Sequence, residues 1–196
     1  MKVQTIYSKR PNLVLGFHGC DSSVAQKVIE GGDLIPSTND YDWLGEGIYF
    51  WENNPERALE WAMNSKNVHK PSVLGAILDL GYCMDLMDTE FLKELKQAYG
   101  KLKEITELAE GEMPVNKGAT PDKLLRRLDC AVIEVAHTIN EEFPYDTVRG
   151  VFLEGNELYP GASFREKNHI QVCVRNPNCI KGYFLPREVD PAFLIP

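Results

Sequence analysis

The sequence predicts a single α+β domain with a helical insertion. Short apolar runs typical of strands lie before residue 87 and after residue 147, whereas residues 87–147 repeat apolar side chains at helical spacing. Strands grouped on either side of a helical stretch are typical of α+β proteins, whereas doubly wound folds alternate the two regularly. The chain has 196 residues, 43% hydrophobic and 26% charged, so one domain spanning residues 1–196 can bury a sizeable core.

The first expected element is a buried strand at residues 13–17, LVLGF, which ends at His18. Asp21, or the serine after it, can cap a helix over about 22–30, which a pair of glycines closes. A short extended stretch, Leu-Ile-Pro, then leads into a polar loop.

The next elements repeat this pattern of strand and helix. Residues 47–51, GIYFW, are β-branched and aromatic and predict a strand. Asn54 and Pro55 then open a helix, with proline in its first turn. Residues 73–80, VLGAILDL, predict another buried strand, which YCMDL continues past Gly81.

The insertion should consist of two helices. Residues 89–110 alternate apolar and charged side chains at helical spacing, and residues 121–140 do so again after a Gly- and Pro-containing linker. Strands are expected again at residues 150–153, 169–174 and 180–184, with a long loop at 154–168.

Charge and cysteine usage exclude several classes of function. The net charge of −8 disfavours non-specific binding to nucleic acid or to an anionic membrane. We see no signal peptide and no apolar run of about 18 residues, so we expect a cytoplasmic protein without a membrane span. The five cysteines are widely spaced and form no CxxC pair, which argues against a zinc site, and we expect no metal.

Three short motifs carry polar groups that could do chemistry: GFHG at residues 16–19, LGEGIYF at 44–50 and KNHIQV at 167–172. Each has an ordinary structural explanation. A histidine after a strand is usually structural, glycines around Glu46 can simply form a turn, and alternating polar and apolar residues occur in any half-buried strand. Taken singly, none of the three is specific.

Taken together, the motifs resemble the diphtheria-toxin and poly(ADP-ribose) polymerase branch of the ADP-ribosyltransferases. In that family a strand ending in His-Gly precedes a G-x-G-I-Y-F strand, and the spacing of about 30 residues is similar here. The resemblance covers roughly residues 13–86 and 148–185, and it implies a split β-sheet core that takes NAD⁺ as substrate. Residues 87–147 match nothing in the family, so we expect a helical insert that leaves the NAD⁺ site intact and that can face a partner.

The resemblance assigns a role to each matching residue. His18 would bind a ribose hydroxyl on the adenosine side of NAD⁺, and Gly19 would clamp the nicotinamide carboxamide with its peptide group. Tyr49 would stack on the nicotinamide ring. We expect His18 and Tyr49 to line one cleft, and side chains on opposite faces of the sheet would contradict the family assignment.

Other positions depart from the family pattern. Arg57 falls where members often carry a serine that assists carboxamide binding, and Trp61 lies about one residue away from a second stacking aromatic. Glu46 stands where the polymerases usually have lysine, which removes a positive charge near the acceptor side.

The third catalytic position is open among several residues. In the family, a glutamate at the start of a late strand binds the 2′-hydroxyl of the nicotinamide ribose. Gln171 is the favoured candidate here, because strand alternation should turn Ile170, Val172 and Val174 to the core and Gln171 to the cleft. Glu166 is the second candidate, and His169 or Glu154 remain alternatives.

These residues predict an NAD⁺-dependent enzyme that transfers ADP-ribose and releases nicotinamide. A glutamine at the third position argues against chain elongation, so we expect mono-ADP-ribosylation of a protein or nucleic-acid acceptor. Hydrolysis of NAD⁺, transfer to a small acceptor, and a catalytically inactive module that binds NAD⁺ or ADP-ribose stay open as alternatives.

Overall fold

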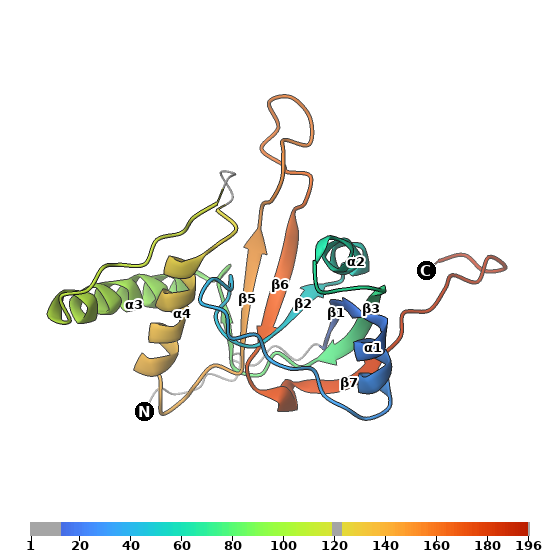
Figure 1. The fold of residues 1–196 in the computed structure, drawn as a ribbon, viewed down its shortest axis with the longest axis horizontal. Helices are drawn as coiled ribbons and strands as arrows, with labels where there is room; N and C mark the ends of the chain where they lie inside the picture. The colour runs from blue at the N-terminus through green and yellow to red at the C-terminus, as the bar shows by residue number, and fades with distance from the viewer. Residues whose placement is uncertain (1–12, 119–122, 196) are drawn as a thin grey trace.

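A computed structural model describes residues 13–118 and 123–195 as a mixed α/β structure around one seven-stranded sheet, which agrees with the α+β prediction (Figure 1). The strands, in chain order, are β1 (Val14–Asp21), β2 (Ile48–Glu52), β3 (Pro71–Leu78), β4 (Cys83–Asp85), β5 (Thr147–Phe152), β6 (His169–Val174) and β7 (Ile180–Phe184). The four helices of the described residues are α1 (Ser22–Ile29), α2 (Pro55–Asn64), α3 (Thr89–Leu108) and α4 (Arg127–Ile139). Within these ranges, no helix is long and apolar enough to cross a membrane.

The sheet is narrowly joined at its middle. Its order is β4-β5-β6-β2-β1-β3-β7, and β1 pairs with β3 along all 8 of its residues. With β2, however, β1 pairs only through Gly16–Glu52 and Phe17–Trp51. Residues 48–50 of β2 pair with β6 alone. Residues 18–21 of β1 and 48–50 of β2 belong to neighbouring strands but do not pair with each other, and we call this place the fork. Figure 1 shows that the two halves of the sheet run in different directions.

Local sequence explains where α1 and α2 begin. The Asp21 carboxylate accepts a hydrogen bond from the backbone N–H of Ser23, and the Asn54 side chain does the same for Arg57, so each caps its helix. Asp21 also accepts hydrogen bonds from the backbone N–H groups of Lys70 and His69, in the loop before β3, and these contacts hold its pKa well below its usual range.

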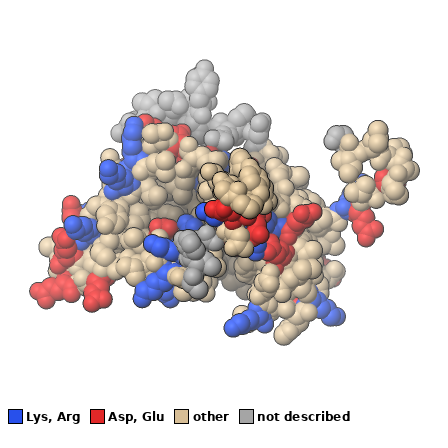
Figure 2. Space-filling model, turned by 90° about the horizontal axis from the view of Figure 1, so that it is seen from above, with Lys and Arg blue, Asp and Glu red and all other residues tan. Residues whose placement is uncertain are grey.

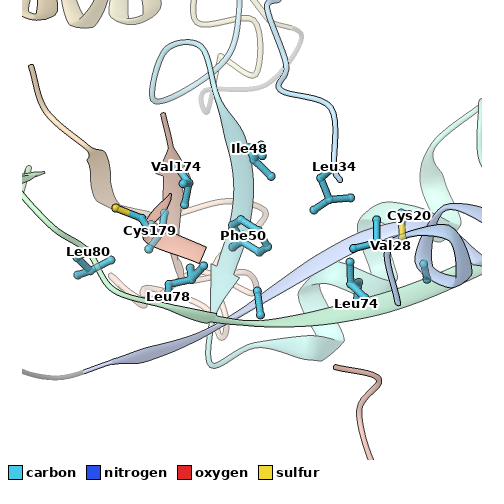
Figure 3. Packing of buried hydrophobic residues seen from close by; sticks show 13 residues of the cluster. Cys20, Val28, Leu34, Ile48, Phe50, Leu74, Leu78, Leu80, Val174 and Cys179 are labelled. Atoms are coloured by element: carbon cyan, nitrogen blue, oxygen red, sulfur yellow. The ribbon is translucent and has the colours of Figure 1, made fainter. Parts of the chain in front are cut away.

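One face of the sheet, which we call the α1 face, carries the larger core. Even-numbered residues of β2 and β6 and the buried side of α1 meet there, among them Phe50, Val174 and Val28 (Figure 3). Because side chains alternate along a strand, the odd-numbered residues of the same strands point to the opposite, α2 face. There α2 covers β1 and β3, where Phe17, Trp51 and Ala58 pack together.

The helical insert covers the other half of the α2 face. Helices α3 and α4 pack on each other and on β5 and β6, and Ile133 and Ala98 are buried against Val148 and Cys173. The insert therefore completes the core instead of standing apart from it.

Several boundaries differ from the sequence-based expectation; β1, for example, continues to Asp21 instead of ending at His18. Helix α4 begins at Arg127, not near residue 121, because Lys117 and Leu125 exchange two backbone hydrogen bonds and hold the preceding chain extended. The expected start itself falls among residues 119–122, outside the described residues. Strand β5 begins at Thr147, three residues before the expected strand at 150–153, where it pairs with β6.

Candidate functional site

The fork turns the peptide group of Gly19 toward β2. The carbonyl of Leu15 accepts a hydrogen bond of 2.9 Å from Asn53, which follows β2, so the peptide groups of odd-numbered β1 residues face β2. Gly19 shares this orientation but lies beyond the last β1–β2 pair. Its N–H and C=O therefore face the fork without a strand partner.

Gly19 is also required for packing. A Cβ at this position would overlap the carbonyl oxygen of Ala58 in α2. The glycine thus allows α2 to lie directly on β1, which is a structural reason for its presence.

His18 links the two sides of the fork. Its Nδ1 lies 2.8 Å from the backbone carbonyl oxygen of Tyr49. A carbonyl only accepts, so Nδ1 carries the proton and Nε2 is left as an acceptor. Burial lowers the pKa of His18, which keeps the ring neutral near pH 7. No other described residue forms a hydrogen bond with this imidazole.

Tyr49 points to the other face of the sheet from His18. The imidazole lies beside Phe50 on the α1 face, whereas the Tyr49 ring packs with Cys173 on the α2 face. The expectation that both side chains line one cleft from a shared face is therefore wrong, and by that criterion it counts against the family assignment. The two residues meet instead through the main chain at the fork.

The Tyr49 hydroxyl is held in place by a turn. It donates to the carbonyl of Gly45 at 2.6 Å and accepts from the N–H of Leu44 at 2.8 Å. Burial, and the neighbouring Cys173, raise the pKa of this phenol far above its usual value, so it stays neutral. The hydroxyl is committed to the fold, and only the half-buried ring remains for a ligand.

The insert holds the same turn from outside. A Glu134 carboxylate oxygen in α4 accepts a hydrogen bond of 2.8 Å from the N–H of Glu46 and pairs with Arg175 at 2.6 Å. Gly45 has φ +78°, a conformation that favours glycine. The Glu46 side chain itself is exposed. The insert thus supports the Tyr49 turn, and its described residues bring no aromatic ring into a stacking contact with Tyr49.

Gln171 lies on the α2 face, as strand alternation predicts. It pairs with Trp51 of β2 and with Gly150 of β5 and is only 8% exposed. Among the described residues, its side-chain amide has no hydrogen-bond partner. Its amide atoms are not among the fully buried side-chain atoms that lack a partner, so this amide is open to water or to a polar ligand. Val172 and Val174 are buried on the opposite face, whereas Ile170, at the start of β6, is only half-buried.

Two fully buried side-chain nitrogens that lack a hydrogen-bond partner among the described residues lie on the residues beside Gln171. His169 Nδ1 bonds the carbonyl of Lys167 at 2.7 Å, but its Nε2 is buried and has no partner within the described ranges. The same is true of the indole nitrogen of Trp51, whose ring centroid is 6.5 Å from that of His169. Burial lowers the pKa of His169 to about 4, and Arg57 and Arg126 contribute, so the ring is a neutral acceptor.

We call Trp51, His169 and Gln171 the strip. A polar pocket of about 430 Å³ opens next to it, between the start of α2 and the β5–β6 loop. Arg57 lines it and pairs with Glu60 and, at 2.8 Å, with Glu154, so its charge is already matched. Glu166 also lines it, and its carboxylate accepts from the backbone N–H of Asn156 at 3.1 Å. Lys167 pairs with Glu60 across the pocket.

Trp61 stands over Trp51 and not over Tyr49. It is 47% exposed, and its ring centroid is 6.1 Å from that of Trp51. The site therefore has two groups on the α2 face, the Tyr49 ring with its turn and the strip formed by Trp51, His169 and Gln171. Trp51 was missed in the sequence, although it lies two residues after Tyr49 and so shares its face.

Comparison with known proteins adds a relative but no function. No family model matches the chain. It is 28% identical over 200 residues to "Uncharacterized protein MJ0359" of Methanocaldococcus jannaschii, an alignment that covers 91% of each chain.

Proposed function

We propose that this chain binds NAD⁺ at the fork between β1 and β2 and transfers its ADP-ribose with release of nicotinamide. The observation that carries the proposal is the hydrogen bond from His18 to the Tyr49 carbonyl. It places an acceptor nitrogen next to the unpaired peptide group of Gly19, where the two halves of the sheet part. In this proposal, the narrowly joined sheet would be the split core of an ADP-ribosyltransferase.

Binding would require NAD⁺ to contact both faces of the sheet. His18 Nε2 would accept a hydrogen bond from an adenosine-side ribose hydroxyl on the α1 face. The peptide group of Gly19 would bind the carboxamide, and the Tyr49 ring would stack on nicotinamide on the α2 face. The opposite orientations of the two side chains then fit the two ends of one dinucleotide.

Gln171 would act where charge develops. As the bond between nicotinamide and ribose breaks, the ribose becomes an oxocarbenium ion and nicotinamide leaves as a neutral base. An amide oxygen that accepts a hydrogen bond from the ribose 2′-hydroxyl stabilises this charge. The acceptor nucleophile then bonds to the ribose C1 and loses a proton. Because an amide cannot take that proton, the acceptor must lose it to solvent.

The remaining candidates take supporting roles in this proposal. Arg57 is matched by Glu60 and Glu154 and would shape the polar pocket, leaving carboxamide binding to Gly19. Trp61 would form one side of the strip, next to Trp51. The polar pocket is the natural place for a protein or nucleic-acid acceptor, since it adjoins Gln171 and the β5–β6 loop.

One observation favours a second function, that of a module that binds NAD⁺ or ADP-ribose without turnover. The buried indole of Trp51 pairs across from Gln171 and packs with Phe17 and Ala58, so a bulky apolar ring stands beside the amide at which a ribose would react. Hydrolysis of NAD⁺ by water is the third alternative, and it needs no acceptor site.

Two measurements on the full chain separate these functions. Isothermal titration with NAD⁺ measures binding, and an assay of nicotinamide release measures turnover. Binding with release, and with radiolabel from NAD⁺ appearing on macromolecules of a cell extract, supports transfer. Release without labelling indicates hydrolysis, binding without release indicates the module, and absence of binding contradicts the proposal.

A further inference from the structure

An apolar pocket of about 400 Å³ lies between α3, α4 and β5, outside the candidate site. Leu92 and Tyr99 of α3 line one part of it, and Phe152 of β5 lines another. Lys96, Arg126 and Asp129 also line it, so its walls carry one net positive charge. Its size lies within the range of about 300–1,000 Å³ typical of ligand pockets, and its lining favours an apolar occupant.

The chain itself carries a matching apolar segment. Residues 185–195 follow β7 without helix or strand, and Phe193 and Leu194 are 75% and 96% exposed. The hydrogen bonds of this segment to other described residues stay local, as in the 3.0 Å bond from the N–H of Ala192 to Asp190. In Figure 2 it stands apart from the body of the molecule, and most of its surface is uncharged. Consecutive exposed apolar residues of this kind mark an interaction segment.

We propose that residues 185–195 of one molecule dock in the α3–α4 pocket of a second copy of this chain. Phe193 and Leu194 would enter the apolar part of the pocket. The segment carries Arg187, Glu188 and Asp190, hence one net negative charge, which is opposite in sign to that of the pocket. Figure 1 shows the segment leaving the molecule at the end away from α3 and α4, which favours a second copy over docking within one chain.

Reciprocal docking would close the assembly. If each molecule places its segment in the pocket of the other, the result is a two-fold symmetric dimer, not an open filament. Each contact would involve one short segment, residues 185–195, and should bury less surface area than a standard protein–protein interface. The dimer should therefore dissociate readily on dilution. The inference does not depend on the proposed NAD⁺ chemistry.

The occupant would touch a ring that also contacts the candidate site. Trp43 lines the pocket and stacks on His169, with ring centroids 6.1 Å apart. Docking should therefore change the fluorescence of Trp43 as the protein concentration rises, and a Trp43→Phe variant should lose that change.

Analytical ultracentrifugation of the full chain, from low micromolar to about 1 mM, tests the proposal. We expect a monomer–dimer equilibrium that Leu194→Asp and Tyr99→Asp each weaken about tenfold or more. Ile105→Asp is the matched control, since Ile105 is similarly exposed on α3 but does not line the pocket. Lys96→Glu should weaken the dimer, and adding Glu188→Lys to the same chain should restore it.

Each other outcome overturns the proposal. A chain that stays monomeric over this range has no second-copy contact. If the chain is monomeric but Leu194→Asp still changes the fluorescence of Trp43, residues 185–195 dock in the pocket of their own molecule. A dimer that Leu194→Asp and Tyr99→Asp leave unchanged uses another surface.

Discussion

His18 donates a hydrogen bond of 2.8 Å from Nδ1 to the backbone carbonyl of Tyr49, at the point where β1 and β2 stop pairing. The imidazole thus takes the place of the next backbone contact between the two strands. This arrangement frees the peptide group of Gly19 and presents Nε2 as an acceptor. It joins two motifs that lie 31 residues apart in the sequence.

His18→Ala should weaken NAD⁺ binding about tenfold or more, because it removes one buried acceptor and leaves the Tyr49 carbonyl unpaired. The affinity of the unmodified chain should stay constant from pH 8 to about 6.5, because the lowered pKa keeps the ring neutral there, and should fall in more acidic solution. Titration calorimetry measures both. His69→Ala, at an exposed histidine, is the control, and equal affinities for the two variants would remove His18 from the site.

Gly19→Ala should destabilise the fold by about 1–3 kcal/mol, because the added methyl group would force α2 away from β1. Urea denaturation measures this change. Gly100→Ala is the matched control in α3, where an added Cβ meets nothing within 4 Å, and it should stabilise the chain by about 1 kcal/mol. A neutral Gly19→Ala would mean that α2 can shift freely, and the packing argument would then be wrong.

Stability should fall as the solution is acidified from pH 6.5 toward pH 4. Burial lowers the pKa of His137 to about 4 from the ordinary value of 6.5, and neither of its nitrogens has a partner in the described part of the chain. Between these values the unfolded chain binds more protons than the folded one, so acid favours unfolding, by on the order of 2 kcal/mol for this histidine.

His137→Leu tests that origin. The variant should be as stable as the original chain at pH 7, since it replaces an unpaired buried polar group with an apolar one. Its acid sensitivity should shrink but persist, because His169, whose pKa is also about 4, remains. Thermal unfolding at several pH values compares the two chains, and an unchanged acid slope would show that His137 does not contribute.

Arg149→Ala should destabilise the fold by about 3–5 kcal/mol. Arg149 is buried in β5 and binds both carboxylate oxygens of Glu52, at 2.6 and 2.9 Å, and Asp85 at 3.2 Å. Removing it leaves the buried carboxylate of Asp85 and the partly buried one of Glu52 without this cation, next to the Gly16–Glu52 pair that joins the sheet halves. Denaturation in urea measures the loss against Arg187→Ala, an exposed arginine that should change stability little. Similar results for both would mean that the ion pairs contribute nothing.

Local sequence signals located most elements of the fold. The expected strands at 169–174 and 180–184 coincide with β6 and β7, because each is short and carries β-branched or aromatic residues typical of strands. The helix starts at Asp21 and Asn54 followed from their capping side chains. The start of α4 did not, because the pairing of Lys117 with Leu125 joins chain segments across a linker and leaves no periodic trace.

The candidate site was only partly predictable for a related reason. Alternation within a strand correctly placed Gln171 with Cys173 and opposite Val172. It could not show that His18 and Tyr49 face opposite sides, since the relative phase of two strands depends on their register, which only pairing determines. The strip of orphaned atoms around Trp51 and His169 likewise emerges only when β2 and β6 lie side by side.

The rate of nicotinamide release from NAD⁺ by Gln171 variants tests the central claim most directly. The account predicts that Gln171→Ala lowers the rate about 10²–10³-fold while weakening NAD⁺ binding much less, and that Gln171→Glu retains or raises the rate. Glu166→Ala, at the carboxylate of the adjacent loop, is the control and should keep most of the activity. If Glu166→Ala abolishes release and Gln171→Ala does not, the loop carboxylate holds the third position; if the unmodified chain releases no nicotinamide at all, the assignment as a transferase is contradicted.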